Sequence, residues 1–194
     1  MPAQLCDRRL RRYTAALCFS SVTAAPMLDK SLPAVFVRRA RPEDEQCMRG
    51  FVQQLSGASR RNRFHGAVSA NAPQLLEALL GTVGELHAAW VACIWGPNGE
   101  QIVGEGGWHV IDEKQRRAEL GVSVLDTWQG SGVVHVLMAK LIDGARDAGV
   151  RELYGDVLET NARMVAFMEK HGMQPSADWP WDSGGAVRME RKLS

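Results

Sequence analysis

Residues 117–149, RAELGVSVLDTWQGSGVVHVLMAKLIDGARDAG, combine two periodicities that decide the fold. The first part alternates as a strand with one buried face does. Its apolar residues are Ala118, Leu120, Val122 and Val124, and Glu119, Gly121 and Ser123 fall between them. After a turn from Asp126 to Gly132, apolar residues recur at helical spacing until Gly149, a typical helix C-terminus. The stretch therefore predicts a strand, a tight turn and an amphipathic helix.

The flanking sequence predicts the rest of a sheet. Further strands are expected at 34–39, 88–95, 101–111, 151–158 and 186–192, and further helices from Pro42 to about Leu55, from about Asn71 or Pro73 to Gly81, and at 161–171. Residues 56–69 are predicted to be a basic, Ser-rich connection. An antiparallel N-terminal meander followed by alternating helices and strands indicates an α/β fold. We expect a mixed central sheet with helices on both faces and a right-handed crossover.

Composition narrows the class of protein. A chain of 194 residues suits one domain with a tail, and 23 basic against 22 acidic residues argue against a dedicated nucleic-acid-binding protein. No run reaches the roughly 18 consecutive apolar residues of a membrane-spanning helix. The four cysteines lie far apart and the histidines show no ligand spacing, which predicts reduced thiols, a cytoplasmic protein and no metal site.

Residues 1–33 differ from the remainder, 34–194, which is expected to form the domain. They carry five basic and two acidic residues, with four arginines between Arg8 and Arg12. A disordered tail is the favoured interpretation. An organelle transit peptide has a similar composition, and Met27 as the true start is a third alternative.

Gly130 and Gly132 stand between the predicted strand and helix. There they would let backbone amides approach an anion at a helix N-terminus, and a diphosphate is the natural ligand. A bare turn has the same pattern. A Walker loop is excluded because Val133-Val134-His135 stands where that loop has Gly-Lys-Ser/Thr. A dinucleotide-binding fingerprint is excluded because this sequence lacks the third glycine of that pattern.

The stretch Gln129-Gly130-Ser131-Gly132-Val133-Val134 resembles motif A of the GNAT superfamily of acyl-CoA-dependent N-acetyltransferases, except that Val134 replaces a Gly or Ala. Asn161, Glu169, Lys170 and Gly172 match the later helix of that family. The resemblance implies the GNAT fold, acetyl-CoA as co-substrate and a primary amine as acceptor. It also implies that the diphosphate lies on residues 129–134, the thioester beside Val122 and Val124, and the pantetheine arm near Asn161.

A narrower resemblance concerns the acceptor side. Residues 55–64 and 72–76, together with the strand Ala118-Glu119-Leu120-Gly121-Val122, are similar to bacterial Pat-type protein-lysine acetyltransferases. This resemblance implies that Glu119 is the general base and that a protein lysine is a possible acceptor. Glu105, in a Gly-rich strand, is the alternative base, and a solvated edge carboxylate is the alternative role for Glu119.

Other features leave alternatives open. Met168 stands where many GNAT enzymes place a Tyr that protonates the leaving thiol, and Tyr154 is expected in the core. Trp179 and Trp181 are interpreted as packing residues or as walls of the acceptor site. Arg60, Arg61 and Arg63 are expected to rim the acceptor cleft, to form a solvated basic face, or to pair with acids of the body. A small-molecule amine acetyltransferase, a non-catalytic CoA-binding domain and a homodimer remain compatible with the sequence.

Overall fold

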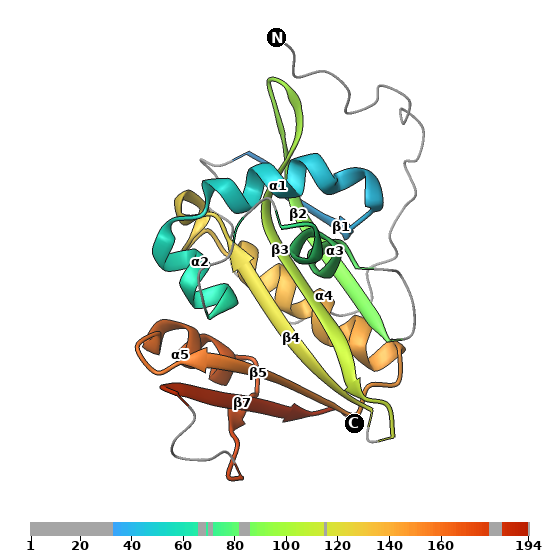
Figure 1. The fold of residues 1–194 in the computed structure, drawn as a ribbon, viewed down its shortest axis with the longest axis vertical. Helices are drawn as coiled ribbons and strands as arrows, with labels where there is room; N and C mark the ends of the chain where they lie inside the picture. Colours follow the sequence, from blue (N-terminus) through green and yellow to red (C-terminus); the bar gives the residue numbers. More distant parts are fainter. Residues whose placement is uncertain are drawn as a thin grey trace.

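The computed structural model describes residues 33–65, 69, 72–81, 86–114, 116–178 and 184–193. They form a seven-stranded mixed sheet in the order β1-β2-β3-β4-β5-β7-β6 (Figure 1). The strands are β1 Phe36–Arg39, β2 His87–Gly96, β3 Gly99–Asp112, β4 Arg117–Val124, β5 Glu152–Leu158, β6 Gln174–Pro175 and β7 Ala186–Lys192. The pair β4–β5 is parallel and the other pairs are antiparallel. The α/β fold with an antiparallel meander is therefore confirmed.

Five α-helices accompany the sheet within the described ranges: α1 Glu45–Gln54, α2 Gly57–Phe64, α3 Pro73–Leu80, α4 Val133–Asp147 and α5 Ala162–Lys170. In Figure 1, α1, α2 and α3 lie in front of the sheet and α4 lies behind it. Short 3₁₀ turns, η1 Pro42–Asp44 and η2 Asp126–Trp128, precede α1 and the Gly130 turn.

Two elements differ from the sequence prediction. The connection predicted at 56–69 contains helix α2, whose polar sequence has no apolar stripe but whose N-terminus is capped by Ser56 accepting from Ser59 N. The two-residue strand β6 is too short to carry a periodicity. Residues 1–32, Trp179 and Trp181 lie outside the described residues, so the expectations for them stay predictions.

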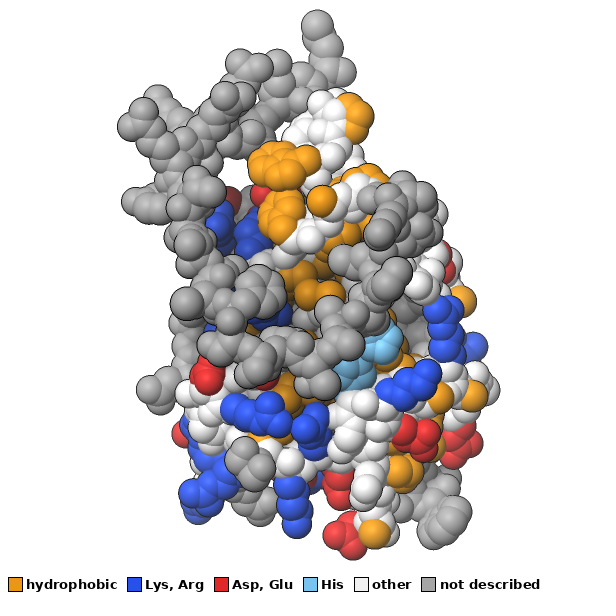
Figure 2. Space-filling model, turned by 180° about the vertical axis from the view of Figure 1, so that it is seen from behind, with side chains coloured by type: hydrophobic (Ala, Val, Ile, Leu, Met, Phe, Trp, Pro, Cys, Tyr) orange, Lys and Arg blue, Asp and Glu red, His pale blue; other side chains and the backbone are white. Residues whose placement is uncertain are grey.

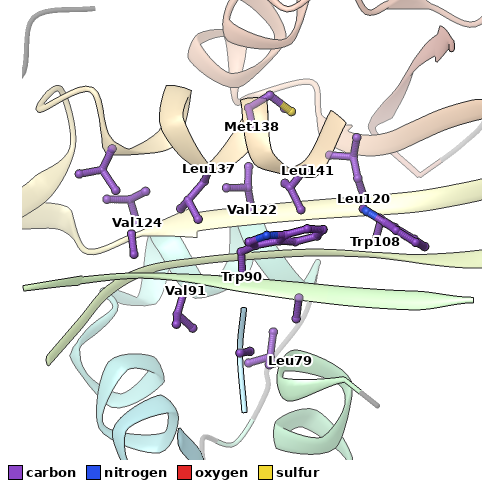
Figure 3. Close-up of a cluster of buried hydrophobic side chains, with 14 of the residues drawn as sticks. Leu79, Trp90, Val91, Trp108, Leu120, Val122, Val124, Leu137, Met138 and Leu141 are labelled. Carbon is purple, nitrogen blue, oxygen red and sulfur yellow. The ribbon is translucent and has the colours of Figure 1, made fainter. Parts of the chain in front are cut away.

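The core is formed on both faces of the sheet (Figure 3). Leu137 and Leu141 of α4 point toward Val122, Leu120 and Trp108 of the strands, and all five side chains are buried. Leu79 of α3 and Val91 of β2 pack on the opposite face (Figure 3). Apolar side chains of β4 thus face α4, which leaves Glu119, Gly121 and Ser123 on the face toward α2, as the alternation predicts.

The surface seen from behind, on the α4 side, has basic and acidic side chains interspersed over its lower half (Figure 2). This mixture agrees with the near-zero net charge of the chain. None of the described helices has the length and apolar character that crossing a bilayer requires.

Candidate active site

Strands β4 and β5 diverge and open a cleft in the middle of the sheet. Among the described residues they pair from Arg117–Glu119 to Glu152–Tyr154 and no further. Beyond this point a cleft of about 820 Å³ lies between Leu120–Val124 on one side and Asp156 and Val157 on the other. Helix α2, the turn before α4, and helix α5 complete its walls. One edge of β4 therefore presents backbone groups to the cleft instead of to a neighbouring strand.

The turn before α4 presents free amides to this cleft. Gly130 and Gly132 have φ of 85° and 90°, which few residues other than glycine adopt without strain. The N–H groups of Gly130, Gly132 and Val134 have no hydrogen-bond acceptor among the described residues. Free N–H groups of alternate residues at the start of a 15-residue helix are typical of a site that can accept an anion.

The residues predicted for the diphosphate divide into two groups. Gln129, Gly130, Gly132 and Val134 line the cleft. Ser131 and Val133 do not, because Ser131 Oγ donates to Trp128 O at 2.6 Å and the Val133 side chain is fully buried. The Val134 side chain stands on the cleft wall where the family pattern has a Gly or Ala, while its amide stays free.

A chain of hydrogen bonds links the two helices that flank the turn. Asp126 accepts from the Ser56 and Ser59 hydroxyls of the α2 N-terminus, each at 2.9 Å. Ser59 Oγ in turn accepts from Gln129 Nε2, and Gln129 Oε1 accepts from Arg163 of α5, both at 3.3 Å. We name this set of five residues the α2–α5 bridge. It fixes α2 and α5 relative to the anion-binding turn.

The remaining residues predicted for the co-substrate also line the cleft. Val122 and Val124 contribute the β4 wall, with side chains packed toward α4. Asn161 lies at the start of α5, where its side chain accepts from Met164 N at 3.2 Å. The N-cap role that the sequence left open for Asn161 is therefore present, together with a place in the cleft wall.

Glu119 lines the cleft at the point where β4 and β5 separate. It accepts a hydrogen bond from the Tyr154 hydroxyl at 3.1 Å. Burial, and then the nearby Glu119 carboxylate, raise the pKa of Tyr154 to about 12. Tyr154 is 3% exposed, as expected for a core residue, but its hydroxyl contacts the candidate base. At neutral pH this tyrosine is a hydrogen-bond donor that orients the Glu119 carboxylate.

Glu105 has a different environment from Glu119. It is 1% exposed, accepts from Ser123 Oγ at 2.6 Å and pairs with Arg63 Nε at 2.8 Å. Both carboxylate oxygens are engaged, since Arg63 Nη2 also donates to Oε2 at 3.4 Å. Glu105 does not line the large cleft. This arrangement suits a structural ion pair better than a base that meets substrate.

The basic cluster on α2 is not uniformly a rim of surface charges. Arg61 is exposed and Arg60 is half-buried, but the Arg63 guanidinium turns inward over Gly121. A Cβ on Gly121 would overlap the Arg63 guanidinium, so a larger residue there would have to displace this side chain. Pairing with an acid of the body, one of the alternatives left open by the sequence, is therefore confirmed for Arg63, because its Nε lies 2.8 Å from Glu105 Oε1.

The far wall of the cleft carries Met168 and His135, and His171 lies behind His135. Met168 is 4% exposed and lines the cleft, in the position where the family comparison expected a tyrosine. His135 Nδ1 and His171 Nε2 lie 2.9 Å apart. Burial, and then His135 and Arg191, lower the pKa of His171 to about 4. Burial, and then Lys170, also lower the pKa of His135, so both rings are neutral near pH 7. No group of three metal-ligating side chains occurs among the described residues.

Comparison with known proteins decides the family. The model of the Acetyltransferase (GNAT) family matches residues 62–173, more than half of the chain. The chain belongs to the GNAT acetyltransferase family. The match covers the anion-binding turn, Glu119 and the whole of α5.

Relatives and solved structures agree with this GNAT assignment. An acetyltransferase of Pseudomonas aeruginosa is 34% identical over 120 residues, which is 62% of this chain and 64% of that protein. The GNAT domain of PAT from S. lividans has a TM-score of 0.73 at 22% identity, covering 81% of this chain and 89% of that one. A GCN5-related N-acetyltransferase from Kribbella flavida has a TM-score of 0.65 at 20% identity, covering 82% and 98%. These structural likenesses establish the fold.

Several residues of this GNAT site were not found from the sequence. Ser56, Ser59, Asp126 and Arg163 form most of the α2–α5 bridge, and Ser123 anchors Glu105. The Ser56-x-x-Ser59 spacing before α2 is a capping signal that could have located the start of this helix. No local pattern connects Ser59 with Gln129, which lies 70 residues away in the chain.

Proposed function

We propose that this GNAT protein transfers the acetyl group of acetyl-CoA to a primary amine by direct attack. The observation that supports the co-substrate most is the set of three free amides at Gly130, Gly132 and Val134, at the N-terminus of α4. Such a concavity fits a diphosphate. Val134 narrows the approach to this concavity, yet its amide still faces the cleft.

The amine acceptor needs a base. At pH 7, removal of the proton from an alkylammonium with a pKa near 10.4 costs about 4.6 kcal/mol, so a general base must assist this deprotonation. Glu119 is the proposed base because it lines the cleft where the strands separate and its carboxylate forms no ion pair among the described residues. Glu105 is already engaged by Arg63 and Ser123.

In the proposed step, the acetyl group passes directly from the sulfur of CoA to the nitrogen of the amine. Acetyl-CoA supplies an activated acetyl thioester. The amine nitrogen forms a bond to the acetyl carbon, the carbon–sulfur bond breaks, and the sulfur leaves with the bonding electron pair. Glu119 accepts the proton that the amine loses. Backbone amides on the unpaired edge of β4 are placed to donate to the thioester oxygen as negative charge develops there.

No tyrosine is needed on the leaving-group side. Release of CoA as a thiolate, with a pKa near 8.5, costs only about 2 kcal/mol at pH 7 relative to the thiol. Water can protonate the thiolate after it leaves. Met168 therefore does not argue against turnover. A protein lysine and a small amine both remain candidates for the acceptor.

Acetyl-CoA binding and thiol release test this proposal separately. Isothermal titration calorimetry should give a Kd in the micromolar range with acetyl-CoA. Val134→Asp should abolish binding because it sets a carboxylate beside the amides that hold the diphosphate. Ala139→Asp, an exposed position on the same helix, adds the same charge and should leave the Kd unchanged. Release of free thiol with a panel of primary amines then reports acetyl transfer, and binding without any transfer would favour a non-catalytic CoA-binding domain.

A further inference from the structure

A second cavity of about 150 Å³ opens beside the cleft, on the sheet face that α2 and α3 cover. It shares Arg63, Glu119 and Gly121 with the cleft, so the two spaces adjoin. We call it the side pocket. It reaches away from the β4–β5 opening toward β2 and β3, which is where an acceptor could lie without overlapping the co-substrate.

The floor of the side pocket is a dent in the sheet. Gly107 of β3 lies directly opposite Gly121 of β4, so two neighbouring strands lack side chains at the same level. The missing side chain at Gly121 makes room for the Arg63 guanidinium, and Gly107 leaves the floor beside it low. The Arg63 guanidinium covers Gly121 and forms the boundary between the side pocket and the cleft. Two positions further along, the register pair His109 and Glu119 lies on the same face of the sheet and lines one end of the dent.

One wall of the side pocket is aliphatic, formed by Leu75, Ala78 and Leu79 of α3. Aromatic and ionisable side chains form much of the remaining lining, including Phe64, Trp108, His87 and His109. Burial, and then His109, lower the pKa of His87, so His87 is neutral near pH 7. His109 is exposed at the opposite wall.

The charges around the side pocket leave one carboxylate unmatched. The Arg63 charge is matched by Glu105, and burial of this arginine is compensated by Glu105 and then Glu119, which raise its pKa. Glu119 accepts from Tyr154 and forms no ion pair among the described residues. The pocket thus offers an aliphatic wall with a single free carboxylate where it meets the cleft.

Building on the proposed acetylation of amines, we propose that the side pocket binds the carbon stem of the acceptor and that the acceptor is an unbranched primary alkylamine. A cavity of about 150 Å³ with apolar walls accepts benzene, which has six non-hydrogen atoms. A chain of four or five methylenes with a terminal nitrogen has the same size. The ammonium end lies beside Glu119. A free amino acid that reacted through its α-amine would bring its own carboxylate close to Glu119. No unpaired cation among the described lining residues would offset the repulsion between the two carboxylates, so such an acceptor is disfavoured.

A stem of this length occurs both in a lysine side chain and in a free linear amine. The two sources are distinguished by comparing n-pentylamine with a capped peptide that contains one lysine. A protein acceptor predicts a kcat/KM at least tenfold higher for the peptide, and a free amine acceptor predicts the reverse order. Either result is compatible with the side pocket, whose own test is the dependence on stem length.

Stem length is tested with ethylamine, n-propylamine, n-butylamine and n-pentylamine, and with thiol release as readout. Each buried methylene should raise kcat/KM about fourfold in the wild-type protein. Ala78→Trp plugs the pocket from an exposed position on α3 and should lower kcat/KM for n-pentylamine at least tenfold, with ethylamine little affected. Ala78→Leu should give an intermediate loss. Glu77→Trp places the same ring on the neighbouring exposed residue, which does not line the pocket, and should match the wild-type protein.

Calorimetry with acetyl-CoA accompanies each variant and should give the same Kd throughout, because none of these residues lines the co-substrate cleft. A stem-length dependence that is flat, or that is identical in Ala78→Trp and Glu77→Trp, overturns the side-pocket assignment while acetylation itself stands. A wild-type protein that binds acetyl-CoA and acetylates none of the amines or peptides overturns the proposed function, and the acceptor pocket with it.

Discussion

Arg63 of α2 and Glu105 of β3 form an ion pair inside the protein, with 2.8 Å between Nε and Oε1. Glu105 is 1% exposed and Arg63 retains about a fifth of its side-chain exposure. A carboxylate at this depth is stable when it is paired and hydrogen-bonded, because desolvation of a lone charge costs several kcal/mol. Ser123 and Arg63 provide these partners. The pair therefore holds α2 against the sheet beside Glu119.

Removal of one member of this pair should destabilise the fold strongly. Arg63→Met leaves Glu105 buried without a cation, and we expect the free energy of unfolding to fall by about 3 kcal/mol. Urea denaturation at pH 7 measures this loss. Arg61→Met changes an exposed arginine of the same helix and should stay within about 0.5 kcal/mol of the wild-type protein.

The double variant Arg63→Met with Glu105→Met distinguishes a buried pair from general damage to α2. Because both charges are removed together, it should be more stable than the Arg63→Met single variant. Two outcomes would contradict a stabilising role for this ion pair. One is a double variant whose loss of stability equals the sum of the two single losses. The other is an Arg63→Met variant as stable as Arg61→Met.

Glu119→Gln should lower the rate of acetyl transfer by about a hundredfold or more, the usual contribution of a general base. The amide keeps the size of the side chain, so the Kd of acetyl-CoA should not change. Because a larger fraction of an alkylamine is deprotonated at high pH, the variant should recover part of its rate toward pH 10. Full activity in Glu119→Gln at pH 7, with a dead Glu105→Gln, would transfer the role of base to Glu105.

Tyr154→Phe removes one hydrogen bond to Glu119 and leaves the ring in place. A hydrogen bond of about 1 kcal/mol corresponds to a roughly fivefold lower kcat, without an effect on the Kd of acetyl-CoA. Glu119→Gln combined with Tyr154→Phe should be no slower than Glu119→Gln alone, because the tyrosine acts through the carboxylate. An additional fivefold loss in the double variant would show a separate role for Tyr154.

The contrast between Glu119 and Arg63 shows how far the sequence can predict this site. Glu119 was found because strand alternation assigns its face and because the neighbouring Gly-rich turn carries a recognisable pattern. Helix α2 and the direction of Arg63 could not be found in this way. Helix α2 has no apolar stripe, and Arg63 turns inward only because Glu105 and Gly121, 42 and 58 positions later, provide a partner and a gap. Local periodicity therefore predicts the sheet and the turn. The position of α2 and the direction of Arg63 depend instead on contacts between residues that are far apart in the sequence.

The contact between His135 and His171 should make stability depend on pH. Burial lowers the pKa of His171 from 6.5 to about 4, so between these values the unfolded chain binds a proton that the folded chain does not. The free energy of unfolding should consequently fall as pH drops from 6.5 to 4, by at most about 1.4 kcal/mol per pH unit from this group. Above pH 6.5 His171 should have no such effect.

Urea denaturation of His171→Gln across pH 4 to 7.5 measures this contribution. The variant should show a shallower decline below pH 6.5 than the wild-type protein. His65→Gln, at an exposed residue that follows α2, should keep the wild-type slope. Identical slopes in the wild-type protein and His171→Gln would refute the role of this pair.

The α2–α5 bridge should couple acetyl-CoA binding to the position of α2. Burial alone would raise the pKa of Asp126, but hydrogen bonds from Ser56 and Ser59 outweigh it and lower the pKa, so Asp126 is ionised at pH 7. Asp126→Ala removes the acceptor that orients Ser59, and Ser59 in turn holds Gln129 next to the free amides. Loss of about two net hydrogen bonds, on the order of 1 kcal/mol each at most, predicts an acetyl-CoA Kd weaker by about tenfold.

Ser59→Ala breaks the same path one residue further on and should weaken binding in the same direction. Asp143→Ala removes an exposed carboxylate on α4 that is outside the bridge and should leave the Kd unchanged in calorimetry. Equal affinities in Asp126→Ala, Ser59→Ala and Asp143→Ala would mean that the turn holds its amides in place without help from α2.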